Sequence, residues 1–177
     1  MDVILLDDME SSRAVLRIVL EKTATAVNIH EFDNGLRALE WTRDRVPDLV
    51  VVDLSMPGIS GIEFTRRFRM ESRHQEVPVI MVTATDHADV RMEAHNAGVD
   101  NVLAKPFSPR VLLGLCNKLL QERAEQRYRA ATTTGQYRAL GLHVAQEADK
   151  LTPQAESGVY KELGRRIAEA VRGMRKG

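Results

Sequence analysis

The sequence predicts an α/β fold: a doubly wound sheet of five parallel strands, covered by helices and followed by an α-helical C-terminal extension. Five short apolar runs alternate with segments whose apolar residues recur every three or four positions. The runs are continuous rather than alternating, which is typical of parallel strands buried on both faces. Right-handed crossovers then place helices on both faces, with any functional site at the carboxyl ends of the strands.

Length and composition are compatible with one well-buried domain and a short appendage. The chain has 177 residues, 44% of them hydrophobic and 28% charged, as in ordinary soluble globular proteins. Its one cysteine, Cys116, excludes an intramolecular disulfide. No apolar run approaches a membrane span, and the N-terminus enters strand-like sequence without a signal peptide. We therefore expect a cytoplasmic protein with no membrane partner.

The first half of the predicted sheet contains three strands separated by two helices. Asp33-Asn34-Gly35 is a turn that can cap the second helix, and this helix must end before Pro47. The five elements are expected at Val3–Leu6, Met9–Thr23, Val27–Phe32, Leu36–Arg45 and Asp48–Asp53.

The second half continues the alternation after the Pro57-Gly58 turn. Gly98 is suited to end one helix, and Ser108-Pro109 to begin the last. The elements are expected at Ser60–Ser72, Val77–Thr83, Asp86–Ala97 and Asp100–Ala104, followed by a helix from Ser108 through Leu119. Nothing breaks this last helix before the predicted hinge at Thr132–Gly135, so it can continue.

Polar residues follow four of the five predicted strands. The ends are Asp7-Asp8, Asp53, Thr83 and Lys105, and a parallel sheet brings them to one edge. Neighbouring carboxylates repel unless a cation lies between them, and hard oxygen ligands suit Mg²⁺. A lysine and a threonine complete a phosphate-binding arrangement. Although a lone aspartate before a Pro-Gly turn is more often a turn-former, these partners favour an aspartate that attacks a phosphoryl group.

The same residues carry a resemblance to a known family. Asp7-Asp8, Asp53 with Met56-Pro57-Gly58, Thr83-Ala84 and Lys105-Pro106-Phe107 occur in order at the ends of the expected elements. Over about residues 1–121 the sequence resembles the CheY-like receiver domain of two-component response regulators, which has a flavodoxin-like fold.

The resemblance implies a role for each of these residues. Asp53 would accept a phosphoryl group from a phosphohistidine on a sensor histidine kinase or phosphotransfer protein. Asp8 would ligate Mg²⁺ directly, Asp7 directly or through water, and the Ser55 main-chain carbonyl would be a further ligand beside Asp53. Lys105 and Thr83 would each contact a phosphate oxygen. The Lys105–Pro106 peptide bond is expected to be cis. Such a receiver catalyses its own phosphorylation and dephosphorylation.

The sequence departs from the family pattern at Val102. Many receivers have an aromatic switch residue three positions before the lysine, and this chain has valine there. An aromatic ring that rotates inward therefore cannot report phosphorylation. Ser55 and Thr85, at the positions that tune access of water to the phosphoryl group, are small and neutral.

Residues 122–177 are expected to form a helical extension, and their sequence is mildly basic. They carry 11 basic and 7 acidic residues, against 14 and 18 in residues 1–121. Two amphipathic segments, at about 137–151 and 159–174, need a partner for their apolar stripes. That partner is the other segment in a hairpin, the receiver, or a second chain in a coiled coil, and we expect a homodimer.

Three readings of the whole chain remain open from the sequence. The first is a response regulator whose phosphorylation switches helical contacts or dimerisation. The second is a phosphorylation-independent interaction module, and the third is a receiver fragment of a larger signalling enzyme, with residues 122–177 as a connector to an output domain. DNA binding is not expected because the extension has no recognisable recognition helix. No motif of a cyclase, a phosphodiesterase or an ATPase is found.

Overall fold

The computed structural model describes residues 1–133 and confirms the predicted α/β architecture. None of the helices within this range is long and apolar enough to cross a lipid bilayer. The elements are β1 (Asp2–Leu6), α1 (Glu10–Leu20), β2 (Asn28–Phe32), α2 (Gly35–Trp41), β3 (Leu49–Asp53), α3 (Gly61–Arg69), the 3₁₀ turn η1 (Ser72–His74), β4 (Val79–Thr83), α4 (Ala88–Asn96), β5 (Asn101–Ala104) and α5 (Pro109–Thr133).

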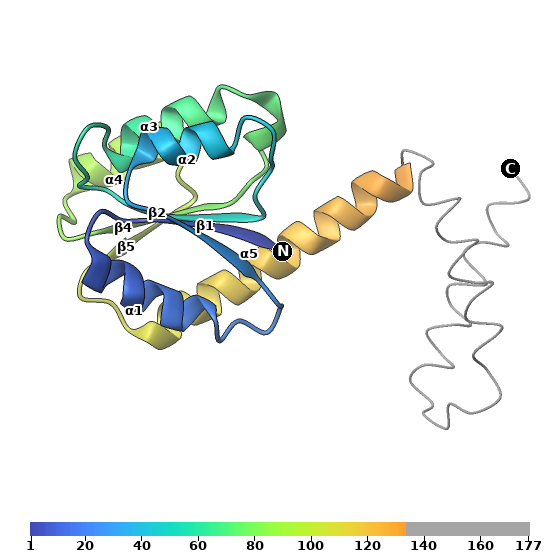
Figure 1. Ribbon diagram of the computed structural model, residues 1–177, viewed down its shortest axis with the longest axis horizontal. Helices are drawn as coiled ribbons and strands as arrows, with labels where there is room; N and C mark the ends of the chain where they lie inside the picture. The colour runs from blue at the N-terminus through green and yellow to red at the C-terminus, as the bar shows by residue number, and fades with distance from the viewer. Residues whose placement is uncertain (134–177) are drawn as a thin grey trace, which may run out of the picture. The chain divides into compact units, whose positions relative to one another are not determined.

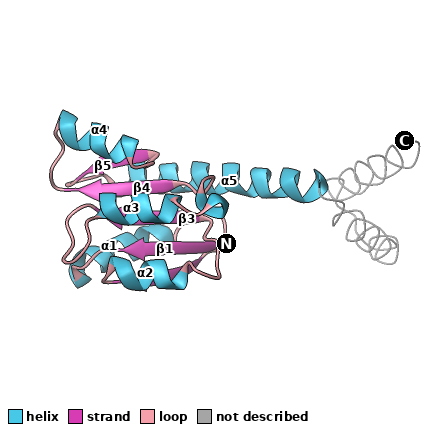
Figure 2. Ribbon diagram, turned by 90° about the horizontal axis from the view of Figure 1, so that it is seen from above, coloured by secondary structure: helices cyan, strands magenta, loops and turns pink. Residues whose placement is uncertain are grey.

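The five strands form one parallel sheet with the order β2-β1-β3-β4-β5. Helices α2, α3 and α4 lie on one face, and α1 and the first part of α5 lie on the other (Figure 1). The arrowheads of β1 and β4 point the same way in Figure 2, as a parallel sheet requires. The strand order reverses between β1 and β3, and ligands of doubly wound folds bind at the carboxyl edge beside such a reversal.

Two hydrophobic cores lie on the two faces of the sheet, and neighbouring residues of the same strand supply both. Val50 and Val52 of β3 pack under α2, α3 and α4, whereas Leu49 and Val51 pack against α1 and α5. All five residues of β3 and all five of β4 are buried. This two-sided burial is the reason that the strands are continuous apolar runs.

Some predicted element boundaries are wrong by a few residues. Strand β4 begins at Val79 rather than Val77, because the Val77 amide donates to the His74 carbonyl in the preceding turn (3.1 Å). Helix α3 ends at Arg69, and the predicted last turn is replaced by η1. Thr132 and Thr133 are helical, so the predicted hinge does not begin there.

The prediction that the last helix continues is confirmed, since α5 extends to Thr133. Met1–Ala124 forms a compact unit by itself. The domain division after residue 121 stays a prediction, and the amphipathic segments expected at 137–151 and 159–174 lie outside the described residues.

Arg69, at the end of α3, joins the loop before β4 to the loop before β5, on the side of the sheet opposite the carboxyl edge. Its guanidinium donates to the main-chain carbonyls of Val77 (2.6 Å) and Gly98 (2.8 Å). It also pairs with Asp100 (3.0 Å). Burial lowers the pKa of Arg69 from its ordinary value and outweighs the opposite effect of the Asp100 charge. The Asp100 carboxylate in turn accepts from the Val79 amide (2.7 Å), which fixes the start of β4.

Gly61 allows the first turn of α3 to lie against the end of β3. Its amide donates to the Leu54 carbonyl (2.9 Å), and a Cβ atom at this position would lie 2.2 Å from the Asp53 main-chain oxygen. Only a residue without a side chain fits this approach. The backbone of Asp53 is thereby held between β4 and α3.

We predict that Gly61→Ala lowers the free energy of unfolding by about 1–3 kcal/mol, because the methyl group must displace the backbone of Asp53. Urea denaturation followed by circular dichroism measures the change. Gly114→Ala is the matched control, since a Cβ there meets no atom within 4 Å. In α5 that substitution is expected to stabilise by roughly 0.5–1 kcal/mol. Equal stabilities for Gly61→Ala and wild type would contradict the prediction.

Candidate functional site

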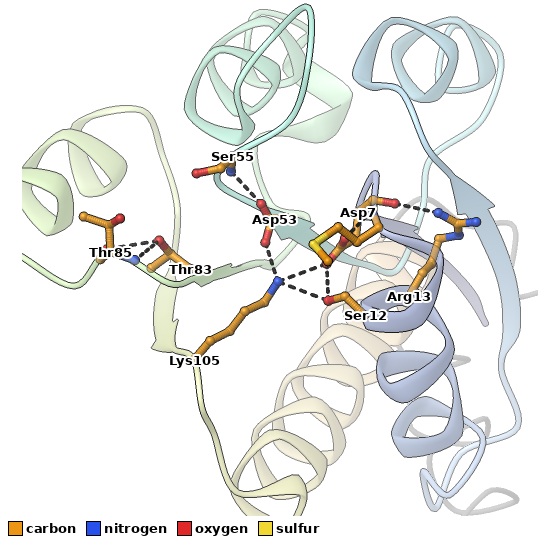
Figure 3. A network of polar contacts seen from close by, with 9 residues as sticks. Asp7, Ser12, Arg13, Asp53, Ser55, Thr83, Thr85 and Lys105 are labelled. Carbon is orange, nitrogen blue, oxygen red and sulfur yellow. Dashed lines mark hydrogen bonds and ion pairs between the residues drawn. The ribbon is translucent and has the colours of Figure 1, made fainter.

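Four strand ends deliver side chains to the carboxyl edge of the sheet (Figure 3). Asp7 follows β1, Asp53 ends β3, Thr83 ends β4 and Lys105 follows β5. The parallel register pairs Asp53 with Val82 and Thr83 with Ala104, so the ends of these strands are aligned. The convergence expected from the sequence is thus observed for the backbone at all four positions.

The Lys105 ammonium group lies between two buried carboxylates. Its Nζ is 2.6 Å from Asp53 Oδ1 and 3.2 Å from Asp7 Oδ2. Burial of Lys105 acts to lower its pKa, but the hydrogen bond and charge of Asp53, together with those of Asp7, outweigh this effect and raise it. Lys105 is therefore the cation that relieves the repulsion between the two carboxylates.

The carboxylate of Asp53 is held at both oxygens. While Oδ1 accepts from Lys105, Oδ2 accepts from the main-chain amide of Ser55 at 2.6 Å. The residue is 6% exposed. The carboxylate of Asp53 is therefore held in a fixed orientation, with the ammonium group of Lys105 beside it.

Thr83 has the predicted place but faces a different partner. Its Oγ1 donates to the Thr85 carbonyl (3.0 Å) and accepts from the Thr85 amide (2.9 Å). Figure 3 shows this pair apart from the hydrogen bonds of Lys105. The Thr83 hydroxyl is therefore engaged in the loop before α4 rather than with Asp53.

The two acidic residues after β1 differ in their surroundings. Asp7 is fully buried and bonded to Lys105, whereas Asp8 is exposed. Within residues 1–133, no three Asp, Glu, His or Cys side chains lie close enough to enclose a metal ion. Mg²⁺ needs only one or two protein carboxylates and completes its shell with water and phosphate, so the carboxylates of Asp7 and Asp53 fit it. The ligand set Asp7, Asp8, Asp53 and Ser55 stays a prediction.

Two residues of α1 belong to the network and were missed from the sequence. Ser12 Oγ donates to Asp7 Oδ2 (2.5 Å) and accepts from Lys105 Nζ (3.1 Å). The Arg13 guanidinium donates to the Asp7 main-chain oxygen (2.8 Å) and pairs with Glu31 (3.2 Å). The available signal was that α1 begins directly after Asp7-Asp8, so its first turn must lie over the strand end.

Residues 3–117 match the family model described as response regulator receiver domain, which is well over half of the chain. The chain belongs to the response regulator receiver family. The predicted fold and resemblance are confirmed, and the Lys105–Pro106 peptide bond is cis as expected. Receiver domains interact with sensor histidine kinases or phosphotransfer proteins, and magnesium is typical of the family.

Curated relatives include proteins with different outputs. The chemotaxis protein CheY of Pseudomonas aeruginosa is 33% identical over 68% of this chain and 97% of its own length. The cyclic di-GMP phosphodiesterase response regulator RpfG of Xanthomonas campestris pv. campestris is 37% identical over 71% of this chain, but only 33% of RpfG is covered. The chain spans about half the length of the phosphate regulon regulator PhoB of Pseudomonas aeruginosa.

Solved structures show the same fold. CheY4 of Vibrio cholerae has a TM-score of 0.61 and 26% identity, and the match covers 67% of this chain and 97% of CheY4. The response regulator Rcp1, solved in a Mn²⁺-bound form, has a TM-score of 0.57 at 18% identity over 67% of this chain and 90% of its own. At that identity the likeness to Rcp1 concerns the fold alone.

We predict that Lys105→Gln lowers stability at neutral pH and that its difference from wild type shrinks in alkali. Because the pKa of Lys105 is raised above its ordinary 10.5, its contribution is complete below that pH and is lost as the pH rises through the folded-state pKa. Urea unfolding at pH values from about 8 to about 12 measures the difference. Lys22→Gln, at an exposed position, controls for the loss of charge. A difference in the free energy of unfolding between wild type and Lys105→Gln that stays constant over this pH range would be inconsistent with the ion pair.

Proposed function

We propose that the chain is a response regulator whose receiver takes a phosphoryl group onto Asp53. In the transfer, a carboxylate oxygen of Asp53 forms a bond to phosphorus while the phosphorus–nitrogen bond of the donor phosphohistidine breaks. The imidazole leaves with its bonding electron pair and gains a proton. The product is a mixed acid anhydride on Asp53.

The observation that carries this proposal is the contact of Asp53 Oδ1 with Lys105 Nζ at 2.6 Å on the carboxyl edge of the sheet. Phosphorylation adds negative charge at this carboxylate, and the ammonium group is already placed to neutralise it. Phosphoryl transfer depends mainly on such positioning and charge neutralisation. When bound, Mg²⁺ would supply further neutralisation, and Asp7, Asp8, Asp53 and the Ser55 carbonyl are the groups that would hold it.

The partner that fits this chemistry is a sensor histidine kinase or a phosphotransfer protein with a phosphorylated histidine. Thr83 is the residue that would transmit the change, by exchanging the main chain of Thr85 for a phosphoryl oxygen. Val102 lies opposite Met81 in the sheet and packs against the core under α3 and α4. Movement of Thr83 would therefore be transmitted through β4 and the packing of Val102, without an aromatic ring.

A receiver within a larger signalling protein is the second candidate, and the partial coverage of RpfG and PhoB favours it. The phosphodiesterase of RpfG and the transcriptional activity of PhoB are properties of those proteins. A phosphorylation-independent module is disfavoured by the network in which partly buried Lys105 pairs with the buried carboxylates of Asp7 and Asp53. A module that binds no phosphate has no need of two buried carboxylates and a lysine, which are costly to desolvate.

Incubation with acetyl phosphate and Mg²⁺ is expected to add one phosphoryl group, measured by intact mass spectrometry. Asp53→Asn should abolish the addition because the amide is not a nucleophile. Asp33→Asn, at an exposed position before α2, is the matched control and should be modified like wild type. A folded wild-type chain that stays unmodified, or an Asp53→Asn variant that is still modified, would refute the assignment.

We further propose that phosphorylation promotes a homodimer of the full chain. The amphipathic segments predicted in the C-terminal extension motivate this, since each has an apolar stripe that needs a partner. Sedimentation with Mg²⁺, with and without beryllofluoride, is expected to show a shift from monomer to dimer, and Asp53→Asn should not shift. The same mass in both conditions would count against the proposal.

A further inference from the structure

Ser12 is hydrogen-bonded to both Asp7 and Lys105, two charged residues that the proposed chemistry uses. It lies in the first turn of α1, is partly buried, and donates from Oγ to Asp7 Oδ2 at 2.5 Å. The same oxygen accepts from Lys105 Nζ at 3.1 Å. Figure 3 shows the three side chains closing a triangle, with Asp53 on the other side of the ammonium group.

The hydrogen bonds of Asp7 leave little room for another partner. Its Oδ1 accepts from the Met9 amide (2.9 Å), and its Oδ2 accepts from both Ser12 and Lys105. A carboxylate oxygen has two lone pairs, so Oδ2 is fully used while Oδ1 has one left. A cation that binds Asp7 through Oδ2 must displace Ser12 or Lys105.

Of these two donors, Ser12 is the one that can leave without separating charges. Lys105 keeps Asp53 as a partner, and removing it would leave two buried carboxylates facing each other. The Ser12 hydroxyl carries no charge, and its bond to Asp7 is broken by rotation about a single side-chain torsion. A hydroxyl that donates to a carboxylate nevertheless forms a charge-assisted bond, stronger than one between neutral groups.

We propose that Ser12 is a positioning residue that competes with Mg²⁺ for Asp7 Oδ2, the oxygen that shares Lys105 with Asp53, and holds Lys105 between Asp7 and Asp53 in the unphosphorylated receiver. The inference rests on the proposed function, because it concerns the same carboxylate edge. It adds a restraint supplied by α1: the Ser12 hydroxyl lowers the affinity of Asp7 for the cation. Release of this hydroxyl accompanies occupation of the site.

The test is the affinity of the full chain for Mg²⁺, measured by isothermal titration calorimetry without a phosphodonor. Ser12→Ala is expected to bind Mg²⁺ about ten- to a hundredfold more tightly, which corresponds to the net value of one hydrogen bond to a charged group. Ser12→Thr keeps the hydroxyl and should bind like wild type. Ser11→Ala, at the exposed neighbouring position of α1, should also leave the affinity unchanged.

Equal or weaker binding by Ser12→Ala would overturn the inference, as would Ser12→Thr behaving like Ser12→Ala. Phosphorylation of the same preparations by acetyl phosphate separates this result from failure of the proposed function. If Asp53 is phosphorylated but the affinities are equal, only the role of Ser12 fails. If wild type binds no Mg²⁺ and Asp53 stays unmodified, the proposed function itself fails.

Discussion

The ion pair between Lys105 Nζ and Asp53 Oδ1 is the interaction on which the carboxyl edge of the sheet depends. Asp7 directly follows β1, and Asp53 ends the adjacent strand β3. Burying two unpaired carboxylates side by side would cost several kcal/mol. Lys105 reaches both from β5, across the end of β4. Because β4 lies between β3 and β5 in the sheet, the Lys105 side chain must extend past the end of β4 to contact Asp53. The Lys105–Pro106 peptide bond that follows is cis. The contact between Lys105 and Asp53 therefore stabilises the fold and also supplies the positive charge that the proposed phosphoryl transfer needs.

The rest of the scaffold keeps that contact in place. Strands buried on both faces have little freedom to shift, while the loops at their ends carry the polar groups. Gly61 brings α3 against the backbone of Asp53, and the Ser55 amide fixes its second carboxylate oxygen. Arg69 fixes the start of β4 at the opposite end, so the strand that ends in Thr83 is anchored there. The Thr83 hydroxyl is bonded to the main chain of Thr85 in the loop after β4.

Much of this arrangement was predictable because periodicity and strand ends are local properties of the sequence. Continuous apolar runs indicated doubly covered strands, and the residues after them indicated Asp7, Asp53, Thr83 and Lys105. Other features depend on tertiary geometry. Which residue of the Asp7-Asp8 pair faces inward is decided by the path of the chain after β1. Ser12 and Arg69 act through contacts across 93 and 29 positions of sequence, to Lys105 and Gly98, and no local pattern reports them. The last turn of α3 was misplaced because η1 continues a helical pattern with tighter geometry.

We propose that Asp53 is the nucleophile and Lys105 its counter-ion. A crystal structure of the full chain with beryllofluoride and Mg²⁺ tests it most directly, because beryllofluoride forms a phosphoryl-like adduct on a carboxylate nucleophile. We expect the adduct on Asp53, with Lys105 Nζ within hydrogen-bonding distance of a fluorine atom and the Thr83 hydroxyl turned from Thr85 to the adduct. An unmodified Asp53, or an adduct that Lys105 does not contact, would contradict it.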